Sequence, residues 1–309
     1  MRVPRTLFAS LIAVGMVVLP FASAGASPKA LSARPAASSP TIVIGNEGFT
    51  ESDLLQYIYG DLLKNAGFKV SYQSTASRAV AIPALEAGHL DLLPDYAGSL
   101  LIYLDKTALK QAGTLSLAAP LLNSLLSSKG AEVLAATQGL DQNVFVVTQA
   151  TKAKYHLTTI SSLKPYASKL VFGAPPECPT YYFCETGLKN IYGLTFKQVK
   201  AYDEGGPLTV KALQTGAAQV VELFSTESVI GADNFYQLTD NLNLEPADHL
   251  IPVIRKSFVN AKLTAALASV NKDLTTSVLT QLDAQPGEGS HPSIQAVAEG
   301  FLMTEKLIS

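Results

Sequence analysis

Side chains that could act as a nucleophile, a general base or a metal ligand are few in this chain of 309 residues. The four histidines are scattered along the sequence, at His89, His156, His249 and His291. The sequence contains no HExxH motif, no glycine-rich phosphate loop and no metal-spaced Cys/His cluster. Ser225 lies in a Phe-Ser-Thr stretch and not in the G-x-S-x-G turn of a serine hydrolase. We therefore predict a protein that is not an enzyme and that uses no cofactor or metal ion.

The only cysteines are Cys178 and Cys184, with five residues between them. A close pair across a short loop forms a disulfide in an oxidising compartment. The alternative is a redox or metal-binding pair, for which the expected spacing would be C-x-x-C. We predict a disulfide that holds the loop Thr180-Tyr181-Tyr182 rigid at the edge of the cleft. It should contribute more to local rigidity than to global stability, because closing so short a loop restricts few conformations of the unfolded chain.

One pattern in the sequence leads from a helix through a strand to an aromatic residue. The stretch Ala84–Ser99 has the end of an apolar helix, a stop at Gly88, a short apolar strand over residues 90–93, and then Tyr96. Pro94 is expected to end the strand, because proline has no amide hydrogen to donate to a sheet. Tyr96 would then lie at the edge where open α/β sheets bind ligands.

The same pattern occurs a second time in the stretch Ala212–Thr226. Gly216 precedes Phe224 by the interval at which the first glycine precedes its tyrosine. The strand-like segments Ile42–Gly45 and Leu170–Gly173 are related by the same offset. Chance is the alternative, since helix–glycine–strand units are common. The repeat indicates two similar α/β lobes, each of which presents an aromatic residue to a cleft.

The N-terminus has the three-part layout of a secretory signal peptide over residues 1–26. Arg2 and Arg5 precede the apolar run Leu7–Leu19, and small residues follow up to position 26. A membrane anchor is the alternative, but the run is shorter than the about 20 residues that span a bilayer. No cysteine follows for a lipid anchor, so we expect a soluble, periplasmic protein with a disordered linker over residues 27–40.

Composition and periodicity indicate an α/β protein with a packed core and no nucleic-acid partner. The 23 basic and 25 acidic residues nearly balance, and no Lys/Arg run is present. Helical and strand patterns alternate, which predicts a mostly parallel sheet in each lobe, flanked by helices, with a two-strand hinge. The expected boundaries are 41–143 for the first part of lobe I, 144–248 for lobe II and 249–309 for the return to lobe I. We also expect Thr50 to cap the helix that follows it, and a helix over Leu263–Leu274.

Three segments resemble a known family. They are Gly45-Asn46-Glu47-Gly48-Phe49-Thr50-Glu51, the stretch from Pro83 through Tyr96 to Leu100, and Phe224-Ser225-Thr226-Glu227. From about Thr41 to its end the chain resembles the substrate-binding proteins of ABC importers for glycine betaine, choline and carnitine. The resemblance implies a type II periplasmic-binding-protein fold that closes on a quaternary ammonium group.

Such a cation is weakly hydrated, so aromatic faces hold it by cation–π attraction. By resemblance, Tyr96 matches a cage tyrosine, Phe224 stands where a second tyrosine is common, and Thr209 replaces a third. Phe49 is either a ligand contact or core packing, and ordinary packing is also the alternative for the other two aromatic residues. The remaining candidates from the same motifs are Asp95, Ser225 and Thr226.

Relatives that bind betaine hold its carboxylate with basic side chains. One such lysine is often found where this chain has Glu47, and an arginine aligns on Tyr181. Arg78 could supply an anion clamp from another direction, and Glu222 can share the pocket face of Phe224. This pattern favours a cation with a neutral tail, such as choline, over betaine. The alternative is that Glu47 is solvated and lies outside the pocket.

We therefore predict a monomeric solute-binding protein that delivers a small quaternary-ammonium or related cation to the permease subunits of an ABC importer. A binding protein for another amino-acid-like or aromatic cation is the second reading. An enzyme on the same fold is the third, and it lacks a nucleophile–base pair.

Overall fold

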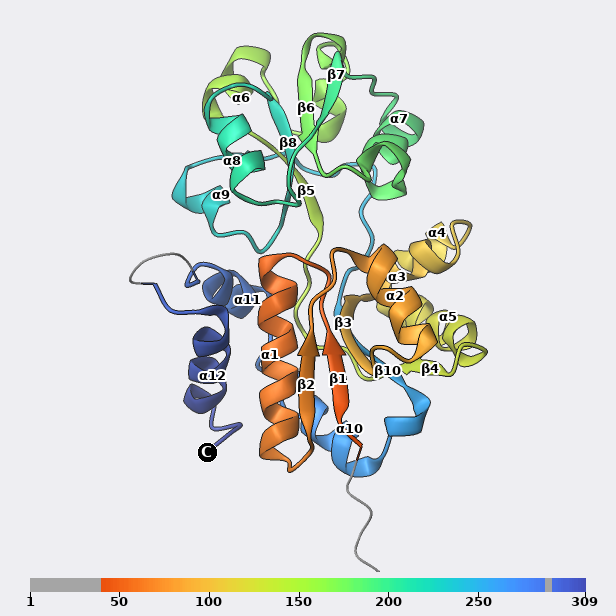
Figure 1. The fold of residues 1–309 in the computed structure, drawn as a ribbon. Coiled ribbons are helices and arrows are strands. Elements are labelled where there is room, and N and C mark those ends of the chain that lie inside the picture. The colour runs from red at the N-terminus through yellow and green to blue at the C-terminus, as the bar shows by residue number, and fades with distance from the viewer. Residues whose placement is uncertain (1–39, 287–290) are drawn as a thin grey trace, which may run out of the picture. The chain divides into compact units, whose positions relative to one another are not determined.

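The computed structural model describes residues 40–286 and 291–309. The predicted signal peptide (1–26) and all but the last residue of the predicted linker (27–40) lie outside the described residues. Two five-stranded sheets organise the described chain (Figure 1), and we call the parts built on them lobe I and lobe II. No helix in this part of the chain has the length and apolar character needed to cross a membrane.

Lobe I is built on the sheet with the strand order β2-β1-β3-β10-β4. Its strands are β1 (Ile42–Gly45), β2 (Val70–Gln73), β3 (Leu92–Tyr96), β4 (Ala131–Val133) and β10 (Leu250–Arg255). Its helices are α1 (Thr50–Asn65), α2 (Arg78–Ala87), α3 (Ala97–Leu104), α4 (Leu109–Ala112), α5 (Leu115–Ser127), α10 (Ala261–Ala268), α11 (Thr276–Asp283) and α12 (Ile294–Thr304), with the 3-10 turn η5 (Lys256–Phe258).

Lobe II repeats this plan with the strand order β7-β6-β8-β5-β9. Its strands are β5 (Asn143–Val147), β6 (Val171–Ala174), β7 (Gln198–Ala201), β8 (Val220–Phe224) and β9 (Tyr236–Gln237). Its helices are α6 (Gln149–Tyr155), α7 (Gly187–Tyr192), α8 (Pro207–Gln214) and α9 (Val229–Ala232), with the short turns η1 (Ile160–Leu163), η2 (Ala167–Lys169), η3 (Cys178–Thr180) and η4 (Tyr182–Thr186).

Four of the five strands in each sheet run in one direction. In lobe I only β10 runs against the others, and in lobe II only β5 does. These two strands are the ones that the chain reaches just after crossing between the sheets, from β4 to β5 and from β9 to β10. The predicted α/β class, with mostly parallel sheets flanked by helices, is confirmed.

The internal repeat seen in the sequence is a structural repeat with an offset of 128 positions. Ile44 pairs with Leu92 between β1 and β3, and Phe172 pairs with Val220 between β6 and β8. Side chains repeat as well: Val43 N donates to Asp91 Oδ2 at 2.9 Å, and Val171 N donates to Gln219 Oε1 at the same 2.9 Å. Because the register repeats, Tyr96 and Phe224 occupy equivalent strand ends in the two sheets.

Glycine ends the helix before each of these strands. Gly88 has φ 80° after α2, and Gly216 has φ 72° after α8, both in the left-handed region that favours glycine. The chain can therefore turn sharply from each helix into the buried strand that carries the aromatic residue.

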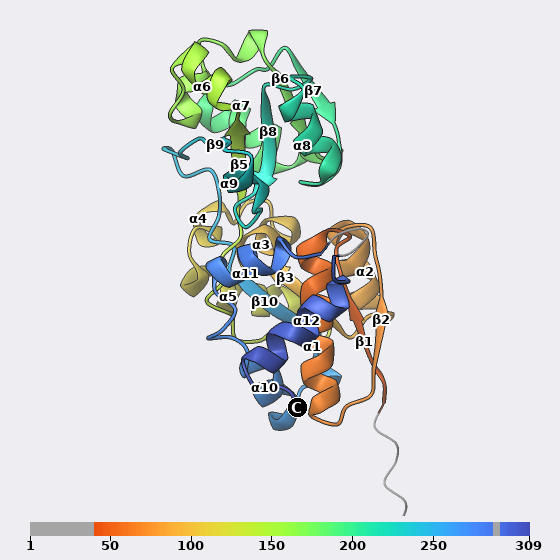
Figure 2. The same ribbon diagram turned by 90° about the vertical axis from the view of Figure 1, so that its left-hand side faces the viewer.

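Apolar helix faces pack on both sides of each sheet. In lobe I, α1 buries a stripe that includes Leu54, Leu55, Ile58 and Leu62 together with residues of α10, α11 and α12. Figure 2 shows α1, α11 and α12 side by side on this face. Residues of α2, α3 and α5 belong to a separate cluster on the other face. The strand ends that carry the site are thus held between packed layers.

Three local predictions were wrong. Pro94 does not end its strand, because it lies opposite Pro252 in β10 while β1 pairs with β3 only at Leu92, so no neighbouring strand needs its amide hydrogen. Thr50 is the first residue of α1, with Phe49 at the cap position and no side-chain cap. The helix expected over Leu263–Leu274 ends at Ala268, because Asn271 instead bonds the segment before β5.

Candidate functional site

Two adjoining chambers lie in a cleft that is lined by residues of both lobes. The smaller chamber has a volume of about 40 Å³ and the larger one about 370 Å³. Phe49, Glu204 and Phe224 line both chambers. The smaller chamber is further lined by Glu47, Arg78, Tyr96, Ser99, Asp141, Asn143, Pro175, Glu177, Tyr181, Glu222 and Asp248.

Three aromatic rings meet where the two chambers adjoin. The ring centroid of Phe49 lies 6.2 Å from that of Tyr96 and 5.2 Å from that of Phe224. Phe49 precedes α1, whereas the other two rings come from the ends of β3 and β8. Such a cluster offers aromatic faces from both lobes to a cation that binds in the cleft.

Tyr96 is fixed by hydrogen bonds at both of its ends. Its amide donates to Asp95 Oδ1 at 2.6 Å, and its hydroxyl donates to Glu51 Oε1. Burial and then the Glu51 carboxyl raise the pKa of Tyr96 well above its usual value. The hydroxyl therefore stays protonated and keeps the ring in place.

Tyr181 reaches the smaller chamber from the loop that the disulfide closes. Cys178 and Cys184 are bonded, with 5.1 Å between their Cα atoms, which confirms the predicted disulfide. The Tyr181 ring packs edge-on against Phe183 at 5.7 Å, and its hydroxyl is buried without a hydrogen-bond partner among the described residues. The cross-link thus holds a chamber-lining side chain.

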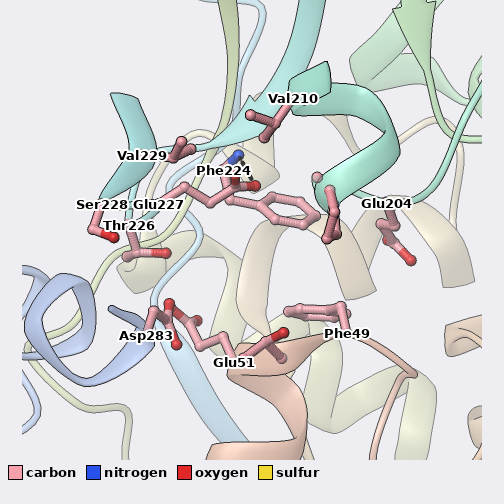
Figure 3. Close-up of a pocket in the computed structure, with 14 residues that line it drawn as sticks. Phe49, Glu51, Glu204, Val210, Phe224, Thr226, Glu227, Ser228, Val229 and Asp283 are labelled. Atoms are coloured by element: carbon pink, nitrogen blue, oxygen red, sulfur yellow. Dashed lines mark hydrogen bonds between the residues drawn. The ribbon is translucent and has the colours of Figure 1, made fainter. Parts of the chain in front are cut away.

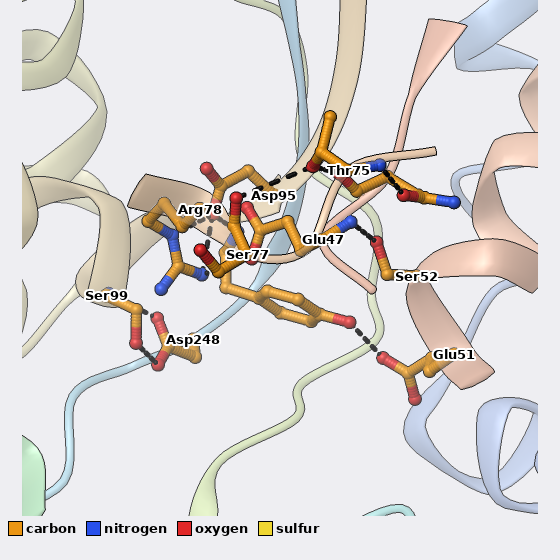
Figure 4. A network of polar contacts seen from close by, with 11 residues as sticks. Glu47, Glu51, Ser52, Thr75, Ser77, Arg78, Asp95, Ser99 and Asp248 are labelled. Carbon is orange, nitrogen blue, oxygen red and sulfur yellow. Dashed lines mark hydrogen bonds and ion pairs between the residues drawn. The ribbon is translucent and has the colours of Figure 1, made fainter. Parts of the chain in front are cut away.

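Arg78 is the only basic side chain that lines either chamber within the described part of the chain. Its Nη2 lies 2.8 Å from Asp95 Oδ1 and 3.1 Å from Glu47 Oε2, and its Nε donates to Asp95 at 2.9 Å (Figure 4). Two buried carboxylates therefore surround this guanidinium. Arg78 is already paired and is not free to clamp an anion.

The rest of the smaller chamber is acidic. Burial, and then Glu204 and Glu177, raise the pKa of Glu222 well above its usual value. Burial and Glu177 raise the pKa of Glu204 to about 7. Among the described residues, Glu47 Oε1 and Glu222 Oε2 have no hydrogen-bond partner. Buried acceptors without donors favour a ligand that brings positive charge.

Asp248 and Asp141 occupy equivalent positions before β10 and β5 and bind the segments that follow the aromatic residues. Asp248 accepts from Ser99 N at 2.7 Å and from Ser99 Oγ at 2.6 Å (Figure 4). Asp141 accepts from Ser225 Oγ at 2.9 Å and from Thr226 N at 3.1 Å. Each hinge segment thereby fixes the segment that follows one aromatic strand end, which is the start of α3 in lobe I and a loop in lobe II.

The larger chamber lies between two acidic walls (Figure 3). Phe49, Glu51 and Asp283 come from lobe I, and Phe224, Thr226 and Glu227 come from lobe II. Glu227 Oε1 accepts from Phe224 N at 3.1 Å.

The structure places most of the predicted site residues at these chambers. Tyr96, Glu47, Arg78 and Tyr181 line the smaller chamber, Thr226 lines the larger one, and Phe49 and Phe224 line both. The alternative that Glu47 is solvated is wrong, since it is only 3% exposed.

Asp95 and Ser225 line neither chamber, and each instead binds a residue that lines the smaller chamber. Asp95 holds Arg78, and Ser225 is bonded to Asp141 and to Gln142 N. Thr209 is buried and bonded to Asp203, also away from both chambers.

Several acids were not predicted from the sequence, and two of them, Glu177 and Glu204, lie in short connections that carry no local signal. Asp141 and Asp248 carried a usable signal, since each stands two residues before the hinge residue that faces an aromatic strand end. Glu222 and the two cysteines could in principle hold a metal ion, but both sulfur atoms are used in the disulfide.

Comparison with known proteins places the fold and the family. A crystal structure of a glycine betaine/carnitine/choline ABC transporter protein has a TM-score of 0.67 and 22% identity, covering 87% of this chain and 100% of that one. YehZ from Escherichia coli without ligand gives 0.63 and 20%, covering 87% and 100%. An ABC-transporter choline-binding protein in complex with choline gives 0.59 and 12%, covering 86% and 89%.

These likenesses show a type II periplasmic-binding-protein fold. No curated protein matches the chain in a sequence comparison. The family described as the substrate-binding domain of ABC-type glycine betaine transport systems matches residues 40–304. Its members are solute-binding proteins and not enzymes. The chain therefore belongs to this family of substrate-binding domains.

Proposed function

We propose that this protein works outside the cytoplasm and delivers a small organic cation, choline-like in carrying a quaternary ammonium group and a neutral tail, to the permease subunits of an ABC importer. The observation that carries this proposal is the combination of three aromatic rings with an acidic lining whose only basic side chain, Arg78, is already paired. Among the described residues, no basic side chain other than Arg78 lines either chamber.

Aromatic rings and carboxylates contribute differently to such a site. The faces of Tyr96, Phe49 and Phe224 suit methylated ammonium, which cannot donate hydrogen bonds and is weakly hydrated. The buried carboxylates supply the opposite charge through space. A cation placed among Glu177, Glu204 and Glu222 would relieve the mutual repulsion of these groups.

The same lining disfavours a zwitterion such as glycine betaine. Its carboxylate would need charged or multiple donors once buried. Arg78 is held between Glu47 and Asp95, and Tyr181, with which the family resemblance aligns an arginine, lines the chamber without a positive charge. A betaine carboxylate would therefore meet carboxylates in most directions.

A thermal-shift panel tests the class of ligand. Choline should raise the melting temperature, since a ligand at 100 times its Kd stabilises the folded state by about 2.7 kcal/mol. The matched control is 3,3-dimethylbutan-1-ol, which has the shape of choline without its charge and should give no shift. Equal shifts from both compounds, or shifts from carboxylates alone, would contradict the proposal. Chemical turnover of the bound compound would point to an enzyme instead.

A further inference from the structure

The larger chamber has features of a second ligand subsite that the aromatic cluster does not explain. Four carboxyl groups line its volume of about 370 Å³, and within the described residues no lysine or arginine lines it. The four are Glu51, Glu204, Glu227 and Asp283. They come from α1, from the loop before α8, from the loop after β8 and from the end of α11.

Buried oxygen atoms at this chamber lack hydrogen-bond partners. Glu51 is 2% exposed, and while its Oε1 accepts from Tyr96, its Oε2 has no partner in the described part of the chain. Thr226 is 1% exposed, and its Oγ1 is equally without a partner there. Asp283 Oδ1 is a third such atom. Leaving buried polar atoms unpaired is costly, so three of them at one cavity indicate a site for a ligand group that forms hydrogen bonds.

These three oxygen atoms belong to neighbouring side chains. Burial and then the Asp283 carboxyl raise the pKa of Glu51, and Thr226 lines the same chamber as these two acids. A primary ammonium group carries three N–H donors and one positive charge, whereas a quaternary ammonium group has no N–H donor at all. The larger chamber thus matches a primary amine better than a second methylated cation.

The two chambers are joined by shared side chains. Phe49, Glu204 and Phe224 line both of them, and the Tyr96–Glu51 hydrogen bond links a ring of the smaller chamber to an acid of the larger one. A single extended ligand could therefore contact both sets of residues across the Phe49–Phe224 pair.

We propose that the larger chamber is a second cation subsite, which binds a primary ammonium group through Glu51, Thr226 and Asp283 when the methylated head of the same ligand lies against the aromatic rings. The ligand class is then a small dication with one quaternary and one primary ammonium group. This inference rests on the proposed function, because it takes the aromatic cluster as the site of the methylated head.

Two carboxyl groups of the larger chamber have raised pKa values. Burial raises the pKa of Asp283 to about 7 and that of Glu227 to about 8. The groups that face this pair are Glu51 and Asp141, with Asp203 acting on Glu227. An ammonium group among these carboxyls favours their ionised forms, so binding near neutral pH should release protons.

The test uses matched pairs of probes in calorimetric titrations of the full chain. Each pair has a trimethylammonium head and an alkyl spacer of the same length, and ends in either an amine or a hydroxyl group. At one spacer length or more, the amine should bind at least about tenfold tighter than the alcohol. The excess should come with proton release, measured as a dependence of the apparent enthalpy on the buffer.

Variants locate the subsite. In Glu51→Gln and in Asp283→Asn the ratio of amine to alcohol affinity should fall towards one. Glu305→Gln removes an exposed surface carboxylate and should leave the ratio unchanged. If the ratio instead falls in Glu222→Gln and not in Glu51→Gln, the amine lies in the smaller chamber and the inference is wrong.

Choline separates the two possible failures. If choline and the alcohols bind but no amine binds more tightly than its alcohol, the second subsite is refuted and the proposed function stands. If neither choline nor any alcohol or amine of the series binds, the proposed function fails and the inference fails with it.

Discussion

Asp141 N donates a hydrogen bond of 3.0 Å to Asp248 O, at the point where the two segments that cross between the sheets lie side by side. The neighbouring residues Leu140 and His249 form an antiparallel bridge. Each aspartate also binds the segment after one aromatic strand end, at Ser99 of α3 in lobe I and at Thr226 in the loop after β8 in lobe II. The hinge and the ligand-facing ends of both sheets are therefore one hydrogen-bonded unit.

Removing either aspartate should destabilise the protein to a similar extent. In Asp248→Ala two buried donors of Ser99 lose their acceptor, and in Asp141→Ala the donors of Ser225 and Thr226 do. Each variant should lose about 1–3 kcal/mol of unfolding free energy in denaturant titrations. Glu299→Ala, which removes an exposed carboxylate, is the matched control. Wild-type stability in both hinge variants would contradict the account.

Tyr96 should contribute its ring more than its hydroxyl to ligand affinity. Loss of an aromatic face against a desolvated cation costs about 2 kcal/mol, so Tyr96→Ala should bind choline roughly thirtyfold more weakly. Tyr96→Phe keeps the ring and removes only the bond to Glu51, and it should retain most of the affinity. Isothermal titration calorimetry on both variants decides this. Unchanged binding in Tyr96→Ala would exclude the ring from the site.

Glu47 should set the preference between a cation and a zwitterion. Glu47→Lys replaces an acid that faces Arg78 with a base, which leaves a positive pair in the smaller chamber. The ratio of betaine to choline affinity should rise by at least about tenfold. Glu47→Gln, which is neutral, should give an intermediate ratio. If the ratio of betaine to choline affinity is unchanged in both variants, Glu47 does not determine which ligand charge is preferred.

Stability without ligand should fall as the pH rises through neutrality. The raised pKa values are about 6 for Asp248, about 7 for Glu204 and Asp283, and about 8 for Glu227. These values exceed those of the unfolded chain, so the folded state holds more protons between about pH 4 and pH 8 and its unfolding free energy declines over that window. Choline, which favours the ionised carboxyls, should bind more tightly at the upper end.

Melting temperatures measured from pH 5 to about pH 8, with and without choline, test this linkage. The slope without ligand should be shallower in Glu227→Gln, because that variant has one raised carboxyl fewer. A slope as steep as that of the wild type would mean that Glu227 does not hold its proton as described.

The internal repeat was the sequence feature that predicted most of the fold and of the aromatic site. The matching intervals from Gly88 to Tyr96 and from Gly216 to Phe224 reflect equal strand registers, so the two aromatic residues fall at equivalent strand ends. The alternation of helical and strand patterns likewise predicted the mostly parallel sheets flanked by helices.

What could not be predicted depends on contacts between distant segments. Pro94 stays in its strand only because Pro252 faces it, which no local rule anticipates. Asp95 belongs to a motif that predicted the site, but it does not line the chamber. It binds Arg78, and the longer side chain of Arg78 is the one that reaches the chamber. Glu204 becomes a chamber acid only because the short connection between β7 and α8 brings it to the aromatic rings.

The central claim is that this cleft binds a small organic cation and lacks a place for a buried anion. Side-by-side calorimetric titration with choline and glycine betaine at neutral pH tests it most directly, since the two compounds share the trimethylammonium head and differ in the tail. We expect choline to bind at least about tenfold more tightly, a difference of about 1.4 kcal/mol. Betaine binding as tightly as choline, or more tightly, would contradict the claim.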